Sequence, residues 1–103
     1  MFQVLISLMV LVAVNMSSFA YASSSQLGTV EFPTSSSGPS QKHFIRGVAA
    51  LHSFWYTEAL SAFEQSIIAD PDFAMGYWGL AMAYNHPLWE DQDKKSASEA
   101  LAK

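Results

Sequence analysis

Two stretches of the chain match one another at a spacing of 34 residues, and this internal repeat restricts the possible folds more than any other feature. Phe44 lies 34 residues before Trp78, and Gly47 lies the same distance before Ala81. A large apolar residue and a small residue therefore keep their types after the shift, whereas the stretches that follow correspond only in part. A period of this length is typical of stacked helical units, each of which buries its apolar face against a neighbour.

Apolar residues recur at spacings of three and four, which predicts amphipathic helices. These helices are predicted to start near residues 40, 57, 73 and 94. Polar side chains at their starts are candidate N-caps, namely Ser40, Thr57, Asp72 and either Asp91 or Asp93. Pro71 is predicted to end the second helix, and the stretch from Asn85 to Asp91, which contains Pro87, to form a loop.

The N-terminus has the pattern of an export signal. A short apolar run is followed by Ala20 and Ala22 at the small-residue positions of a cleavage site. Residues 1–22 are therefore predicted to be a signal peptide, and the mature chain to start at Ser23. The alternative is an uncleaved anchor over residues 2–22, which Gln3 and several other polar residues dilute.

A serine-rich segment separates this N-terminus from the helical part. Residues 23–40 are rich in Ser, Gly and Pro, a composition that buries too little apolar area to offset the entropy of ordering. The segment is predicted to be a flexible linker, although Val30 and Phe32 offer local docking points. Residues 41–103 remain for the helical repeats.

The helical part resembles a tetratricopeptide repeat protein, and more narrowly a group of exported bacterial-type proteins of that class. The resemblance rests on Tyr77-x-x-Leu80-Ala81-x-x-Tyr84 and on Ala59-x3-Phe63 followed by Pro71. The residues that match the repeat signature are Gly47, Tyr56, Ala59, Phe63, Pro71, Tyr77, Leu80, Ala81 and Tyr84.

This resemblance implies an all-α fold of antiparallel helix-turn-helix units, an α-solenoid of about one and a half to two repeats. Residues 41–71 would form the first repeat and residues 72–103 a second, incomplete one. In such a stack Tyr77 and Trp78 fill the space between helices rather than forming two walls of a ligand cage. Members of the group are usually several times longer, so the chain is expected to be the N-terminal part or a truncated form of such a protein, and marginally stable by itself.

Composition and motifs disfavour several other functions. The formal net charge of −4, with only five Lys and Arg residues, disfavours nucleic acid as a partner. The three histidines, His43, His52 and His86, form no metal-binding motif, and cysteine is absent. The serines form no nucleophile motif, and glycines form no phosphate loop, so we expect no catalytic residue, metal or cofactor.

The sequence therefore predicts a non-enzymatic, exported module that binds other proteins or peptides and has some capacity for self-association. Export means secretion, the periplasm or the lumen of the secretory pathway, with no stable membrane anchor once the signal is cleaved. Polar groove candidates are Lys42, Arg46 and Asn85. Two alternatives stay open. One is the N-terminal part of a larger exported enzyme or ligand-binding protein, in which "HSFWY" and "NHPLW" line a pocket, and the other is a membrane-tethered adaptor.

Overall fold

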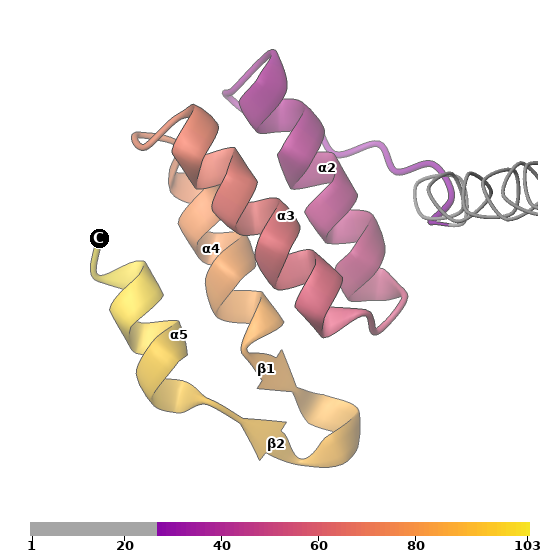
Figure 1. Ribbon diagram of the computed structural model, residues 1–103, viewed down its shortest axis with the longest axis vertical. Coiled ribbons are helices and arrows are strands. Elements are labelled where there is room, and N and C mark those ends of the chain that lie inside the picture. The colour runs from indigo at the N-terminus through magenta and orange to yellow at the C-terminus, as the bar shows by residue number, and fades with distance from the viewer. Residues whose placement is uncertain (1–26) are drawn as a thin grey trace, which may run out of the picture.

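The computed structural model describes residues 27–103, in which four α-helices follow one another in alternating directions (Figure 1). The helices are α2 (Pro39–His52), α3 (Tyr56–Ala69), α4 (Ala74–Ala83) and α5 (Lys94–Leu101). The predicted signal peptide and its cleavage residues Ala20, Ala22 and Ser23 lie outside the described residues. In the described part of the chain, no helix has the length and apolar character needed to cross a membrane.

The prediction of a mostly helical chain is confirmed for these residues. The stretch expected to be a plain loop instead forms a small antiparallel hairpin between α4 and α5. Its strands are β1 (Asn85–His86) and β2 (Asp91–Gln92), which pair Asn85 with Gln92, and the turn holds a short 3-10 helix (Pro87–Trp89). Glu90 closes this turn with a φ of 52°.

Three of the predicted N-caps are wrong. Helix α2 starts at Pro39, after Gly38 with a φ of 70°, because proline fits the first helical turn. Ser40 is buried within that turn, and its hydroxyl donates to the carbonyl oxygen of Ser66 on α3 at 3.2 Å. Thr57 lies inside the first turn of α3, and Asp72 precedes the cap position of α4, so neither side chain caps its helix.

The fourth cap is confirmed. Asp93 precedes α5, and its carboxylate accepts from the Ser96 amide at 3.0 Å and from the Ser96 hydroxyl at 2.5 Å. These two hydrogen bonds lower the pKa of the Asp93 carboxyl below its ordinary value of 3.8, since they favour the charged form.

This lowered pKa makes the start of α5 sensitive to acid. The charged carboxylate stabilises α5 above the ordinary pKa of aspartate, and this contribution is lost as pH falls through the lowered value. We expect the Ser96 amide resonance to shift between about pH 5 and pH 2. In Asp93→Asn, which keeps an accepting oxygen without a titrating proton, the shift should be absent. A Ser96 amide that does not respond to pH in the unmodified chain would contradict this role.

The core lies where α2, α3 and α4 meet, and it is built around Phe44 and Phe63, both fully buried. A Cβ atom placed on Gly47 would lie 2.6 Å from the Phe63 ring, and one placed on Gly79 would lie 2.3 Å from it. The Phe63 ring therefore fits between the backbones of α2 and α4 only because both helices carry glycine there. Gly76 makes a similar approach to Ile67 one turn further along α3.

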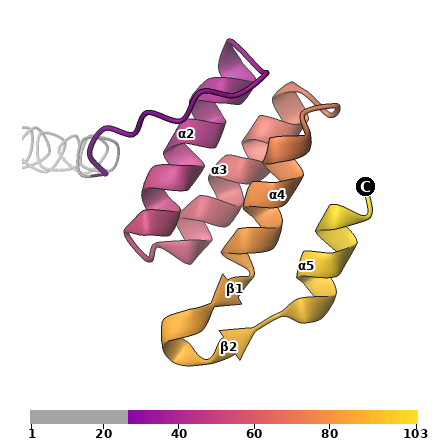
Figure 2. The same ribbon diagram turned by 180° about the vertical axis from the view of Figure 1, so that it is seen from behind.

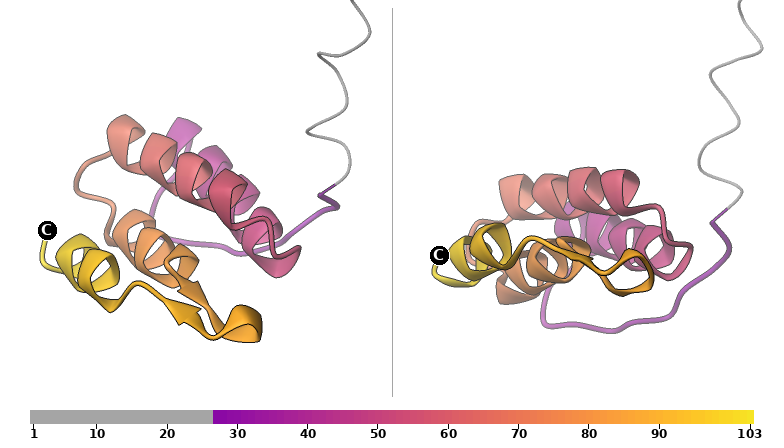
Figure 3. Two further views of the ribbon diagram at one scale, coloured as in Figure 1. Left: turned by 60° about the horizontal axis from the view of Figure 1, so that its bottom comes forward. Right: turned by 90° about the horizontal axis from the view of Figure 1, so that it is seen from below.

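The helices form two layers, with a third covering segment (Figures 2 and 3). Helix α3 lies on one side of the α2–α4 layer, and residues 27–38 cross the other side as an extended segment. We call residues 27–38 the strap. It contains neither helix nor strand.

The strap is attached to the helices by one aromatic residue and one amide. The Phe32 ring lies 5.2 Å from that of Phe44 and 6.2 Å from that of Trp78. The Gln41 side chain donates to the Phe32 carbonyl oxygen at 2.8 Å. Leu27 and Val30 also pack against the core. The linker prediction did not include these contacts, and its C-terminal boundary is corrected because Pro39 and Ser40 already belong to α2.

Candidate binding site

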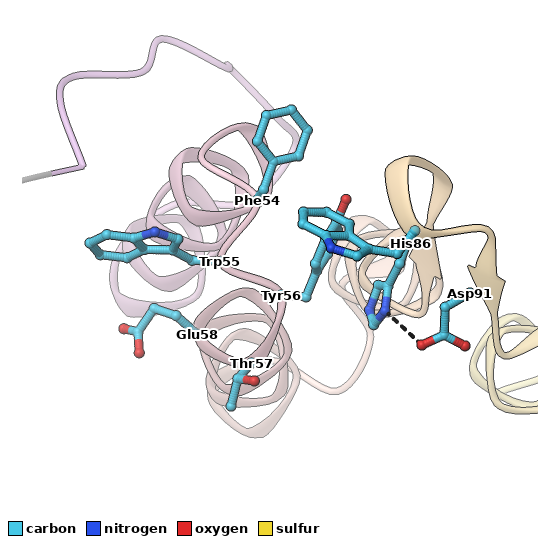
Figure 4. A pocket seen from close by; sticks show the side chains of 8 residues that line it. Phe54, Trp55, Tyr56, Thr57, Glu58, His86 and Asp91 are labelled. Atoms are coloured by element: carbon cyan, nitrogen blue, oxygen red, sulfur yellow. Dashed lines mark hydrogen bonds and ion pairs between the residues drawn. The ribbon is translucent and has the colours of Figure 1, made fainter.

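Two turns bring four aromatic side chains together at one end of the molecule (Figure 4). The turn between α2 and α3 supplies Phe54 and Trp55, and the first residue of α3 is Tyr56. The hairpin supplies Trp89 from its 3-10 turn. Phe54, Trp55 and Trp89 are each about half exposed, at 51%, 45% and 60%. Such exposure is unusual for large apolar side chains unless they serve a contact.

The rings of Phe54, Tyr56 and Trp89 stand at steep angles to one another. Trp89 lies 5.7 Å from Tyr56 at 87° and 6.2 Å from Phe54 at 67°. Phe54 and Tyr56 lie 6.5 Å apart at 58°. These separations fall in the range of favourable edge-to-face contacts, which hold the three rings as walls rather than as one flat platform.

The backbone of the α2–α3 turn determines where these rings lie. Phe54 adopts a φ of 58°, a conformation that non-glycine residues rarely take. The Trp55 amide donates to the Ala50 carbonyl oxygen at 2.9 Å, which closes the turn onto the end of α2. A strained residue at an exposed aromatic turn is typical of functional segments.

His86 joins the hairpin to this cluster. Its ring stacks on Tyr56 with centroids 4.0 Å apart. Its Nε2 lies 3.0 Å from the Ala83 carbonyl oxygen, and its Nδ1 lies 3.3 Å from the Asp91 carboxylate. The prediction that His86 hydrogen-bonds within its turn is confirmed. Both ring nitrogens face oxygen acceptors, so a doubly protonated ring donates to both.

These residues surround an open hollow of about 600 Å³. We call it the aromatic hollow. Its lining residues are Phe54, Trp55, Tyr56, Thr57, Glu58, His86, Trp89 and Asp91. Glu58 forms an ion pair with Arg46 of α2, while Asp91 remains three-quarters exposed beside His86. The hollow thus combines aromatic walls with two carboxylates on its rim.

The repeat-signature residues occupy two different places. Tyr56 belongs to the aromatic hollow, whereas Gly47, Ala59, Phe63 and Ala81 are buried at the helix contacts. The remaining members lie at or near the α3–α4 turn and on the exposed side of α4. They are Pro71, Tyr77, Leu80 and Tyr84. The Tyr77 hydroxyl donates to the Pro71 carbonyl oxygen at 2.8 Å and so ties α4 to the turn that precedes it.

Tyr77 and Trp78 do not share a cavity wall. Trp78 packs against the core beside Phe32 and Phe44, while Tyr77 faces the turn at Pro71. The interpretation of these two neighbours as packing residues therefore agrees with where they lie. The aromatic walls that could hold a ligand are found instead at "HSFWY" and "NHPLW", the two segments proposed from sequence as pocket linings.

The polar groove candidates do not converge. Arg46 is held by Glu58, and it borders a second, smaller hollow together with Lys42 and Leu27. Asn85 begins the hairpin, and its buried side-chain oxygen has no hydrogen-bond partner among the described residues. These three residues thus do not define one binding surface.

Within residues 27–103, no group of three or more histidine, cysteine or acidic residues is arranged to hold a metal ion. A comparison of the chain with protein families, with curated proteins and with solved structures gives no match.

Proposed function

We propose that the chain is an exported, non-enzymatic module that binds other proteins, built on units like those of tetratricopeptide repeats. The first unit would be α2 with α3 and the second α4 with α5. Three features support this assignment. Successive helices run in opposite directions, small residues allow the close approach of α2 and α4 to α3, and the sequence repeats at 34 residues.

The observation that carries the binding function is the strap. The α2–α4 face already holds an extended segment, anchored by the Phe32 ring against Phe44 and Trp78 and by the hydrogen bond from Gln41. A face that accommodates an extended segment with an aromatic anchor suits a segment of the same kind from another protein. In the proposed function, such a partner replaces the strap.

A peptide of residues 27–38 added in trans tests this proposal. In the unmodified full chain the tethered strap competes with the peptide at a high effective concentration, so weak binding is expected. In Phe32→Ala the strap loses its anchor, and we expect the free peptide to bind at least about ten-fold tighter than it does to the unmodified chain. Isothermal titration calorimetry measures both affinities.

The matched control is the same peptide carrying alanine in place of Phe32, which should bind neither chain. Phe54→Ala provides a second control, because it removes an exposed ring of the aromatic hollow and leaves the strap intact. If the native peptide fails to bind the Phe32→Ala chain, or if the alanine peptide binds equally well, the α2–α4 face is not a peptide-binding surface.

Self-association is part of the proposal, because apolar side chains remain exposed on the side of α3 and α5. Ile68 is 70% and Leu101 62% exposed, and both border shallow hollows near Tyr77. A second copy or a further helical unit would cover this surface.

A second candidate is a ligand-binding protein, complete or as the N-terminal part of a larger exported protein. The aromatic hollow favours it, since exposed aromatic walls with a few polar groups are typical of ligand sites. A membrane-tethered adaptor depends on residues 1–22 alone.

A further inference from the structure

The aromatic hollow has the charge of a site for cations. Its two ionisable acids are Glu58 and Asp91, and none of its described lining residues is lysine or arginine. Glu58 is already paired with Arg46, whereas Asp91 contacts His86 alone and is 75% exposed. Asp91 is therefore the carboxylate that an incoming positive group can reach.

The ring geometry also fits a compact cation better than a flat ligand. A sugar or a planar ring needs one broad, unobstructed aromatic face. Here one face of Tyr56 is covered by His86 at 4.0 Å, and Trp89 stands nearly perpendicular to Tyr56. Three rings set at 58° to 87° to one another instead present faces and edges around a common space. Cations bind favourably over such faces, and tryptophan is the strongest of these partners.

We propose that the aromatic hollow binds the side chain of a lysine or arginine on a partner protein. The alkyl stem would pack against Phe54 and Trp89, and the cationic end would lie near the Asp91 carboxylate. The inference rests on the proposed protein-binding function and adds the chemistry of the residue recognised. A partner of this kind also suits the overall charge of the chain, which is −4.

The tripeptide acetyl-Gly-Arg-Gly-amide and its citrulline counterpart test the proposal on the full chain. Citrulline keeps the shape and hydrogen-bonding capacity of arginine but carries no charge. We expect the arginine peptide to bind about ten-fold more tightly than the citrulline peptide, with the difference shrinking as salt is added. The indole N–H resonance of Trp55, which lines the hollow, reports binding in every variant.

Trp89→Ala is expected to weaken arginine binding about ten-fold, and Asp91→Asn about three-fold to ten-fold, while the asparagine still accepts from His86. The matched control is Leu88→Ala, because Leu88 precedes Trp89, is 65% exposed and does not line the hollow. It should bind as the unmodified chain does. Retained helical circular dichroism shows that each variant is folded.

Equal binding of the arginine and citrulline peptides would overturn the proposal, as would an equal loss in Leu88→Ala and Trp89→Ala. If the peptide of residues 27–38 binds the Phe32→Ala chain while the arginine peptide fails to bind, this inference fails and the proposed function stands. If the arginine peptide binds and the peptide of residues 27–38 does not, the hollow stands as a cation site and the α2–α4 surface fails.

Discussion

Replacing Phe44 by alanine is expected to lower the free energy of unfolding by about 3–5 kcal/mol, the largest effect of any single substitution considered. Phe44 is fully buried, and its ring lies between 5.2 and 5.7 Å from those of Phe32, Phe63 and Phe73. Alanine would remove the ring that joins the strap to three helices. Small domains have stabilities of about 5 kcal/mol, so this variant would be close to unfolding.

Urea denaturation followed by circular dichroism measures this loss. Phe44→Leu keeps most of the volume and should lose about 1–2 kcal/mol, which keeps the variant measurable if Phe44→Ala does not fold. Phe54→Ala is the matched control, because its ring is half exposed, and it should cost less than about 1 kcal/mol. Equal losses in Phe44→Ala and Phe54→Ala would show that the core does not depend on Phe44.

Replacing Gly79 by leucine is expected to cost about 3 kcal/mol, although glycine is the poorer helix former. A Cβ atom at this position would lie 2.3 Å from the Phe63 ring, which is fully buried and has no room to move aside. Leucine would therefore force α4 away from α3. Urea denaturation provides the measurement, and the midpoint should fall while the slope stays similar.

Ala74→Leu is the matched control for Gly79→Leu, since it adds a large side chain to the same helix at an exposed position. It should change stability by less than about 0.5 kcal/mol. In the Phe63→Ala background the cost of Gly79→Leu should become smaller, because the leucine then occupies space vacated by the ring. Strict additivity of the two substitutions would mean that Gly79 and Phe63 do not contact each other.

The helices were predictable because apolar spacing and proline punctuation act locally. Pro71 falls between α3 and α4, as expected, and Asp93 caps α5. The caps at Ser40 and Thr57 were not predictable, since a serine or threonine near a helix start fits both a cap and the first turn. Burial against Ser66 decides the matter for Ser40, and this contact spans 26 residues of sequence.

The docking of the strap depends on a tertiary contact that composition does not reveal. Serine-rich segments are generally flexible, yet one phenylalanine in this segment meets a complementary surface formed by Phe44 and Trp78. Phe32 and Val30 were recognisable as docking points. Their partners were not, because those lie on two helices that only the folded chain brings together.

The aromatic hollow was predictable in composition and not in geometry. "HSFWY" and "NHPLW" are conspicuously aromatic, and both were identified as possible pocket linings. Their meeting depends on the β1–β2 hairpin, whose strands are only two residues long and carry no periodic pattern. The contact between His86 and Tyr56 follows from that hairpin.

The proposed function depends most directly on whether the strap lies on the α2–α4 face in solution. Nuclear Overhauser effects between the rings of Phe32 and Trp78, whose centroids lie 6.2 Å apart, measure this contact in the full chain. We expect these effects, together with ordered backbone amides for residues 30–34. Their absence, with rapid motion throughout residues 27–38, would contradict the account, since the face would then hold no extended segment.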